Sequence, residues 1–130
     1  IYNAIPSEIK NAIIDTTVVS GHGSTSGEEN FTSTDKLYLL APKEIYTDFS
    51  SDNDTAKDLT RTLDYYTSIG VTTRNHSGAK KKNGTNADWW WLRVAFSTTS
   101  NNFYYVSSIG SYTNNIAGDT NGVAPAFRLG

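Results

Sequence analysis

The side chains that could do chemistry in this sequence are few and widely spaced. There are two histidines: His22 stands in a Gly-Ser loop and His76 precedes Ser77. Neither has the spacing of a metal-ligand set or of a catalytic triad. Cysteine is absent, which excludes thiolate nucleophiles, disulfides and cysteine metal sites. We therefore expect a protein that is not an enzyme and that holds no cofactor.

Paired carboxylates occur at Glu28–Glu29 and at Asp52 and Asp54. Adjacent acids in loops are usually solvated. Asp52, Asn53 and Asp54 would bring hard oxygen ligands close together, as calcium requires. The ordered glycine and the terminal glutamate of a calcium loop are missing, so we expect no metal and keep a calcium site as the less favoured alternative.

Length and charge narrow the class of protein. The chain has 130 residues and a formal net charge of -2, which predicts one domain over residues 1–130. Nucleic-acid binding needs a dominant basic face, so no nucleic-acid partner is expected. No run approaches the roughly 18 apolar residues of a membrane span, so no insertion into a membrane is expected. Because methionine is absent and the chain starts at Ile1, we expect a piece of a longer precursor.

The order of apolar patterns places short helices first and β-structure last. Helices are expected over residues 6–13 and 42–46 and from an N-cap at Asp54 to Gly70, with Leu59, Leu63 and Tyr66 on one face. Strands are expected over residues 16–20, 36–40, 89–95, 103–107 and 123–129, with loops over 21–34 and 72–88. This order predicts an α+β domain in which two short helices pack on a small, twisted, mostly antiparallel sheet.

Three consecutive tryptophans dominate the strand over residues 89–95. Because side chains alternate along a strand, Trp90 and Leu92 are expected to pack inward, with Trp89, Trp91 and Arg93 on the opposite side. Three such rings are too much apolar area to leave in water, so that side is expected to form a second core layer.

The last strand and its arginine are also expected to belong to the framework. Val123, Phe127 and Leu129 alternate, which predicts that they face inward. Arg93 and Arg128 are expected to serve structure by pairing with aspartates or backbone carbonyls beneath the loops. Gly110 is expected to supply the positive φ of a hairpin turn.

Charge thins abruptly after Lys82. Between Phe96 and Asn121, 14 of 26 residues are Ser, Thr or Asn. Phe96, Ile109 and Ile116 interrupt this polar stretch where turns are expected. Recognition surfaces are depleted in charge and enriched in aromatic residues. The three apolar residues therefore mark a candidate recognition face, although one or two of them could instead tuck beneath a loop.

Several motifs together resemble one group of bacterial and phage domains. They are WWWLR at residues 89–93, FYYV at 103–106, the Gly110 turn and GVAPAFRLG at 122–130, with IIDTTVVSGHGS at 13–24, TSTDKLYLLAPKEIY at 32–46, LDYY at 63–66 and GVTT at 70–73 upstream. The chain resembles the C-type-lectin-like variable proteins of diversity-generating retroelements, whose reverse transcriptase miscopies adenines and so rewrites Asn codons. The resemblance covers most of the chain.

This resemblance implies a C-type-lectin-like fold and a variable, ligand-binding region over residues 94–121. The implied contact residues are Phe96, Thr98, Thr99, Asn101, Ser107, Ile109, Ser111, Thr113, Asn114, Ile116, Gly118, Asp119 and Asn121. The implied partner is a protein or glycan ligand on a cell surface, and the implied location is extracellular display on a bacterium or phage particle. Ordinary loop residues would give much the same Asn and Ser content. Two alternatives therefore stay open: a carbohydrate-binding module of a bacterial surface protein, and a structural surface domain without a specific ligand. The oligomeric state is not predicted.

Overall fold

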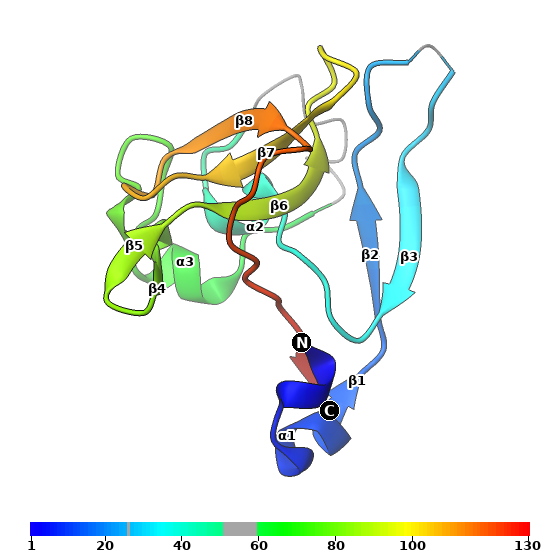
Figure 1. Ribbon diagram of the computed structural model, residues 1–130, viewed down its shortest axis with the longest axis vertical. Coiled ribbons are helices and arrows are strands. Elements are labelled where there is room, and N and C mark those ends of the chain that lie inside the picture. The colour runs from blue at the N-terminus through cyan, green and yellow to red at the C-terminus, as the bar shows by residue number, and fades with distance from the viewer. Residues whose placement is uncertain (26, 51–59) are drawn as a thin grey trace.

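Figure 1 shows the computed structural model, which describes residues 1–25, 27–50 and 60–130. The described helices are η1 Tyr2–Ala4, α1 Ser7–Ala12, α2 Pro42–Ile45, α3 Asp64–Ser68 and η3 Ser77–Ala79. The described strands are β1 Ile13–Ile14, β2 Thr16–Ser20, β3 Phe31–Asp35, β4 Lys81–Asn83, β5 Asn86–Asp88, β6 Trp90–Ala95, β7 Asn102–Val106, β8 Tyr112–Ile116 and β9 Arg128–Leu129. Short helices and antiparallel strands confirm the α+β class. None of the described helices has the length and apolar composition that a membrane span requires.

The strands form separate small sheets instead of the one sheet that the sequence predicts. β6, β7 and β8 form a three-stranded antiparallel sheet, while β1 pairs with β9, β2 with β3 and β4 with β5. The β1–β9 pair brings the two ends of the chain together below the rest of the molecule (Figure 1). The β2–β3 hairpin stands beside the three-stranded sheet.

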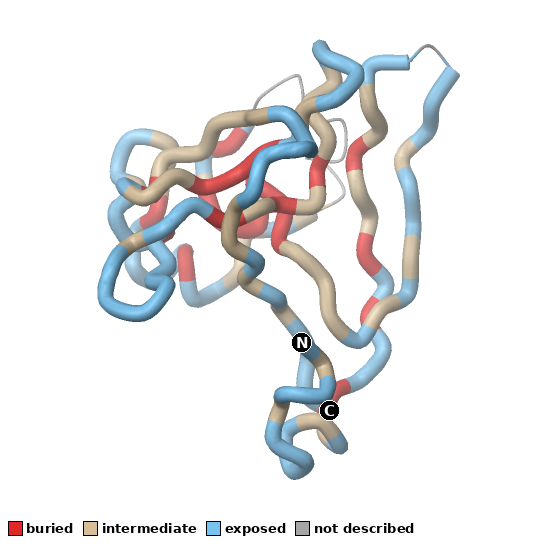
Figure 2. Tube along the Cα trace, in the orientation of Figure 1, coloured by how far each residue is buried: buried red, intermediate tan, exposed pale blue. Residues whose placement is uncertain are grey.

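The core lies between one face of the three-stranded sheet and the helices α2 and α3. Alternate residues of β6 are buried, and Trp90, Leu92 and Val94 are each at most 2% exposed. Tyr104 and Val106 of β7 join them in one cluster with residues of α2 and α3. Figure 2 shows this burial concentrated in the sheet and beneath it. The prediction that Trp90 and Leu92 face inward is therefore confirmed.

The two helices beneath the sheet form for local reasons. Pro42 begins α2, where a missing backbone N–H costs nothing, and the Glu44 carboxylate accepts a hydrogen bond from the Ala41 N–H at 2.7 Å. The α2 prediction is thus confirmed to within a residue. α3 begins at Asp64 and buries Tyr66. The predicted N-cap Asp54 and Leu59 lie outside the described residues, and residues 60–63 are not helical, so the helix starts later than predicted within the described part.

Arg93 connects the sheet to the rest of the molecule. Its Nε donates to the Val19 carbonyl at 3.0 Å, its Nη1 donates to the Leu39 carbonyl at 2.9 Å, and the same Nη1 pairs with the Glu44 carboxylate. The predicted structural role of Arg93 is confirmed, with a glutamate as its acidic partner. Arg128 is exposed and has no ion-pair partner among the described residues, so the pairing predicted for it is wrong.

The second strand of the first hairpin lies earlier in the sequence than predicted. β3 begins at Phe31, inside the expected loop, and pairs with β2 from Thr16 opposite Asp35 to Ser20 opposite Phe31. The strand predicted over residues 36–40 is not formed, and only Tyr38 makes an isolated bridge, to Ala126. The Thr-rich run before Asp35 matches the β-branched run of β2, and that cross-strand pairing outweighs the apolar character of residues 37–40.

Two further expectations need correction, while the helix predicted over residues 6–13 is confirmed at Ser7–Ala12. Residues 81–88 form the β4–β5 hairpin instead of a loop, with Gly84 at φ +67° in its turn. α1 forms but buries none of its residues. Val123, Phe127 and Leu129 are exposed, and of the strand predicted over residues 123–129 only Arg128–Leu129 forms, as β9 paired with β1.

Arg93→Ala is expected to destabilise the fold by about 3 to 5 kcal/mol, because it leaves the Glu44 carboxylate buried without a counter-charge. The matched control is Arg128→Ala, which removes an exposed arginine and is expected to change the free energy of unfolding by less than about 0.5 kcal/mol. Urea unfolding followed by tryptophan fluorescence measures both. Equal losses for the two variants would contradict the role given to Arg93.

Candidate functional site

The candidate surface is built on the side of the three-stranded sheet that faces away from the core. Strand register places Trp91 opposite Tyr105, Tyr105 opposite Thr113, and Phe103 opposite Asn115. Directly opposed residues share a face of a sheet. The residues that alternate with them, Trp90, Tyr104 and Tyr112, belong to the core or pack against it. The opposed residues given above therefore form the outer face of the sheet.

The predicted contact residues do not gather into one patch. One end of the sheet carries residues 96–101 and 116–119, and we call it the loop end. The Ala117 N–H joins these two segments by donating to the Asn101 carbonyl at 2.9 Å. The other end, here the turn end, carries residues 107–111. β7 separates the two ends by about 15 Å, at roughly 3.3 Å per residue. A ligand that contacts both ends would have to span the sheet.

The three apolar residues that interrupt the polar stretch behave differently. Ile109 at the turn end is 63% exposed and Ile116 at the loop end is 45% exposed. Phe96 is half-buried and packs edge-on against Tyr104, with ring centroids 5.5 Å apart. Phe96 is therefore a residue at the margin of the core, whereas the two isoleucines are displayed to solvent.

The remaining predicted residues divide in the same way. Those fully exposed are at the loop end: Thr98, Thr99, Asn101, Gly118 and Asp119. Those half-buried are Ser107, Ser111, Thr113, Asn114 and Asn121. Several of the half-buried side chains bond within the domain, so they also support the framework.

Hydrogen bonds among these half-buried residues stiffen β7 and β8. The Asn102 amide donates to the Asn114 side chain at 2.7 Å, and the hydroxyls of Ser107 and Ser111 lie 2.7 Å apart across the turn. The Nδ2 of Asn121 is buried and has no hydrogen-bond partner among the described residues. These contacts show that part of the predicted variable set is tied into the sheet.

The turn end is held by the buried Tyr46 and by His76, which is partly exposed. Tyr46 donates its hydroxyl to the Gly110 carbonyl at 2.6 Å, and a ring nitrogen of His76 lies 3.1 Å from the Ile109 carbonyl. Burial, reinforced by the neighbouring Tyr66 and Tyr112, raises the pKa of Tyr46 far above its usual value. The phenol therefore stays protonated and remains a donor at all ordinary pH values. His76, which the sequence places in a loop, thus contacts the turn.

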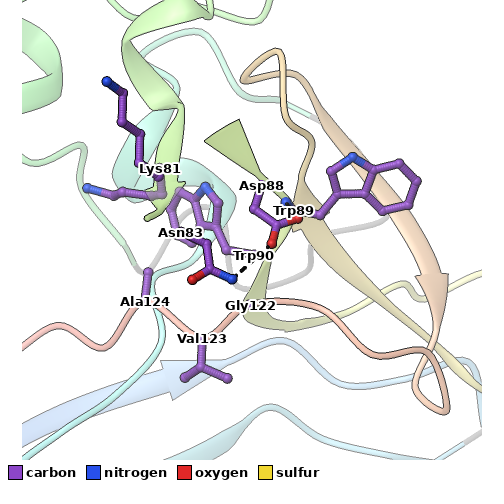
Figure 3. Close-up of a pocket in the computed structure, with 9 residues that line it drawn as sticks. Lys81, Asn83, Asp88, Trp89, Trp90, Gly122, Val123 and Ala124 are labelled. Carbon is purple, nitrogen blue, oxygen red and sulfur yellow. Dashed lines mark hydrogen bonds between the residues drawn. The ribbon is translucent and has the colours of Figure 1, made fainter. Parts of the chain in front are cut away.

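A pocket of about 370 Å³ opens beside the start of β6 (Figure 3). Lys81, Asn83 and Asp88 of the β4–β5 hairpin line one side, and Gly122 and Val123 line the other. The Asn83 side chain donates to the Asp88 carboxylate at 3.3 Å. In Figure 3 the Trp89 ring points away from these residues, so Trp89 contributes mainly its backbone. Sequence reasoning missed this hairpin, although its Asn83–Gly84 pair is a hairpin signal.

Lys81 is held over aromatic rings in this pocket. Its ammonium lies 5.8 Å from the Tyr66 ring centroid and 5.7 Å from that of Trp90. Burial raises the pKa of Tyr66 to about 12, so this ring is neutral beneath the ammonium. Lys81 is therefore partly engaged within the domain.

The candidate metal-ligating side chains and the two histidines lie apart in the described part of the chain. Within residues 1–25, 27–50 and 60–130, no three His, Asp or Glu side chains gather as metal ligands would. His22 places its Nδ1 2.6 Å from the Gly23 carbonyl, far in sequence and in contacts from His76. Asp52 and Asp54, the calcium alternative, lie outside the described residues.

Comparison with known families gives one match. A family model described as "Domain of unknown function (DUF6273)" matches residues 1–130. The chain belongs to this family. No curated protein and no solved structure matches it significantly. The family match spans every element described above, from α1 to β9.

Gly110→Ala is expected to lower the melting temperature markedly, because Gly110 has φ +91° and an added methyl would meet the His76 carbonyl. The loss in free energy of unfolding is expected to exceed about 1 kcal/mol. The matched control is Gly118→Ala at the loop end, where an added methyl has open space. Differential scanning calorimetry measures both, and an unchanged melting temperature for Gly110→Ala would contradict the anchored turn.

Proposed function

We propose that the domain is a non-enzymatic recognition module with a C-type-lectin-like fold. It presents exposed residues of the 94–121 region to a protein or glycan ligand. The small antiparallel sheets and the two short helices beneath the β6–β7–β8 sheet support this fold. The proposal includes display on a bacterial surface or phage particle and diversification by a retroelement.

The observation that carries this proposal is the exposure of Ile109 and Ile116. Both emerge from a nearly uncharged stretch: Ile109 lies in the turn between β7 and β8, and Ile116 is the last residue of β8. The buried cluster of described residues includes neither of them. Apolar side chains displayed in a charge-poor surface are typical of the contact regions of interfaces. The buried framework and the displayed residues are then separate sets, so the second set can change without unfolding the first.

Trp90→Ala and Ile109→Ala are expected to separate stability from recognition. Trp90 is 2% exposed and its loss should cost about 3 to 5 kcal/mol, whereas Ile109→Ala should change stability by less than about 0.5 kcal/mol. Thermal melting measures the difference. Equal losses would count against the division between framework and displayed residues.

The ligand class and the diversification need direct tests. A glycan array and a pull-down with candidate cell-surface proteins separate the two ligand classes. Sequencing the locus for a reverse transcriptase and for a near-duplicate of the gene's 3′ end tests the retroelement. If the locus holds neither, the diversification part of the proposal fails.

One observation favours carbohydrate binding as a second candidate. Trp89 is 40% exposed and stacks on Tyr105, with ring centroids 5.1 Å apart and planes 22° from parallel. Rings held in this way give rigid aromatic area at low entropy cost, which suits stacking on a sugar ring.

Trp89→Ala is expected to abolish any glycan signal on an array while leaving the fold intact. The matched control is Tyr65→Ala, which removes another exposed ring, 62% exposed on α3. Glycan binding that survives Trp89→Ala, or that is lost equally in Tyr65→Ala, would contradict a sugar subsite at Trp89.

A further inference from the structure

A groove of about 450 Å³ lies between the tip of the β2–β3 hairpin and the strands β6 and β7. Its walls include Phe31 and the paired acids Glu28 and Glu29 on the hairpin side, and Ala95 and Phe103 on the sheet side. None of the residues that line it belongs to the predicted contact set. The groove is therefore separate from the predicted contact residues, and Ala95 and Phe103 are its two lining residues within the 94–121 region.

Phe31 lies on the inner face of its hairpin but has no core to enter. Register places Phe31 opposite Ser20, on the same face as the buried pair partners Thr16 and Val18. Side chains on that face are expected to point toward the body of the domain. Phe31 is nevertheless 64% exposed. An inward-facing ring that the domain itself does not cover leaves apolar area available to another molecule.

Phe103 supplies a second ring from the sheet. It stands on the outer face of β7, opposite Asn115, and is 38% exposed. It also borders a neighbouring apolar hollow of about 320 Å³ that Leu39 and Trp91 help to line. Two exposed phenylalanine rings from separate elements thus border the groove.

The charge of the groove is negative. Glu28 and Glu29 are exposed, and neither has a cationic partner among the described residues. The Glu28 carboxylate lies over Gly23, where an added Cβ would be 2.8 Å from its Oε2. Arg93, the one cation that reaches the groove wall within the described chain, is paired with Glu44. Free carboxylates therefore stand beside uncovered rings.

We propose that this groove binds a basic, extended segment of a protein partner through its arginine or lysine side chains. The ammonium or guanidinium group lies against the exposed ring of Phe31 or Phe103 and pairs with Glu28 and Glu29. Cations are attracted to aromatic faces, and carboxylates form their strongest hydrogen bonds with guanidinium groups. A neutral segment would leave both carboxylates unpaired, and an acidic one would be repelled. The proposal does not depend on variation in residues 94–121.

The test uses a fluorescein-labelled peptide of alternating glycine and arginine, and its counterpart with glutamine at each arginine position. Fluorescence anisotropy measures the binding of each to the intact domain at low and at physiological ionic strength. We expect the arginine peptide to bind and the glutamine peptide not to bind. Glu28→Gln/Glu29→Gln should weaken the arginine peptide about tenfold or more, and Phe31→Ala about fivefold.

The matched control is Glu8→Gln/Asp64→Asn, which removes two exposed carboxylates on α1 and α3, away from the groove. This variant should bind the arginine peptide as the unmodified domain does. Thermal melting checks that Phe31→Ala, a substitution at an exposed ring, remains folded. Absence of arginine-peptide binding, equal binding of the glutamine peptide, or equal weakening in the control would each overturn the proposal. The last outcome would mean attraction by net charge alone. Because residues 94–121 stay unchanged throughout, failure here leaves the proposed function standing.

Discussion

The buried ion pair between Arg93 and Glu44 is the interaction on which the arrangement of this domain depends. Through one guanidinium group, β6 is joined to β2 at the Val19 carbonyl, to the connecting chain at the Leu39 carbonyl and to α2 at Glu44. The side chains of the pair are 8% and 11% exposed, so water could not solvate one charge if the other were removed. A charge in such surroundings is tolerated only when its partner is present. The pair therefore determines where the first hairpin and α2 lie relative to the sheet.

This attachment also explains why the domain has an uncovered groove. Arg93 holds the β2–β3 hairpin at Val19, near the end of β2, and beyond that point the chain continues to the tip that carries Glu28 and Glu29. Apolar packing does not close the space between that tip and β7, so Phe31 and Phe103 remain exposed. A polar clamp thus fixes the hairpin without burying its far end.

The sequence correctly predicted the elements that a local pattern of residues is enough to specify. Alternation in β6 identified Trp90 and Leu92 as core, and Pro42 identified the start of α2. Predictions failed where pairing partners decide. β3 forms over Phe31–Asp35 because it matches β2, and only Arg128 and Leu129 of the last predicted strand find a strand partner, in β1. Local apolar content contains no information about such long-range partners.

Charge depletion in residues 94–121 follows from the sequence, which marks Phe96, Ile109 and Ile116 alike as candidates for a recognition face. The structure exposes the two isoleucines. Only the tertiary structure decided that Phe96 lies at the core margin and that the predicted contacts occupy two opposite ends of the sheet. Spacing along a chain fixes which face of a strand a side chain takes. How far apart two turns lie, and what covers them, is set by strand pairing and by contacts such as those of Arg93, which join residues more than 45 positions apart.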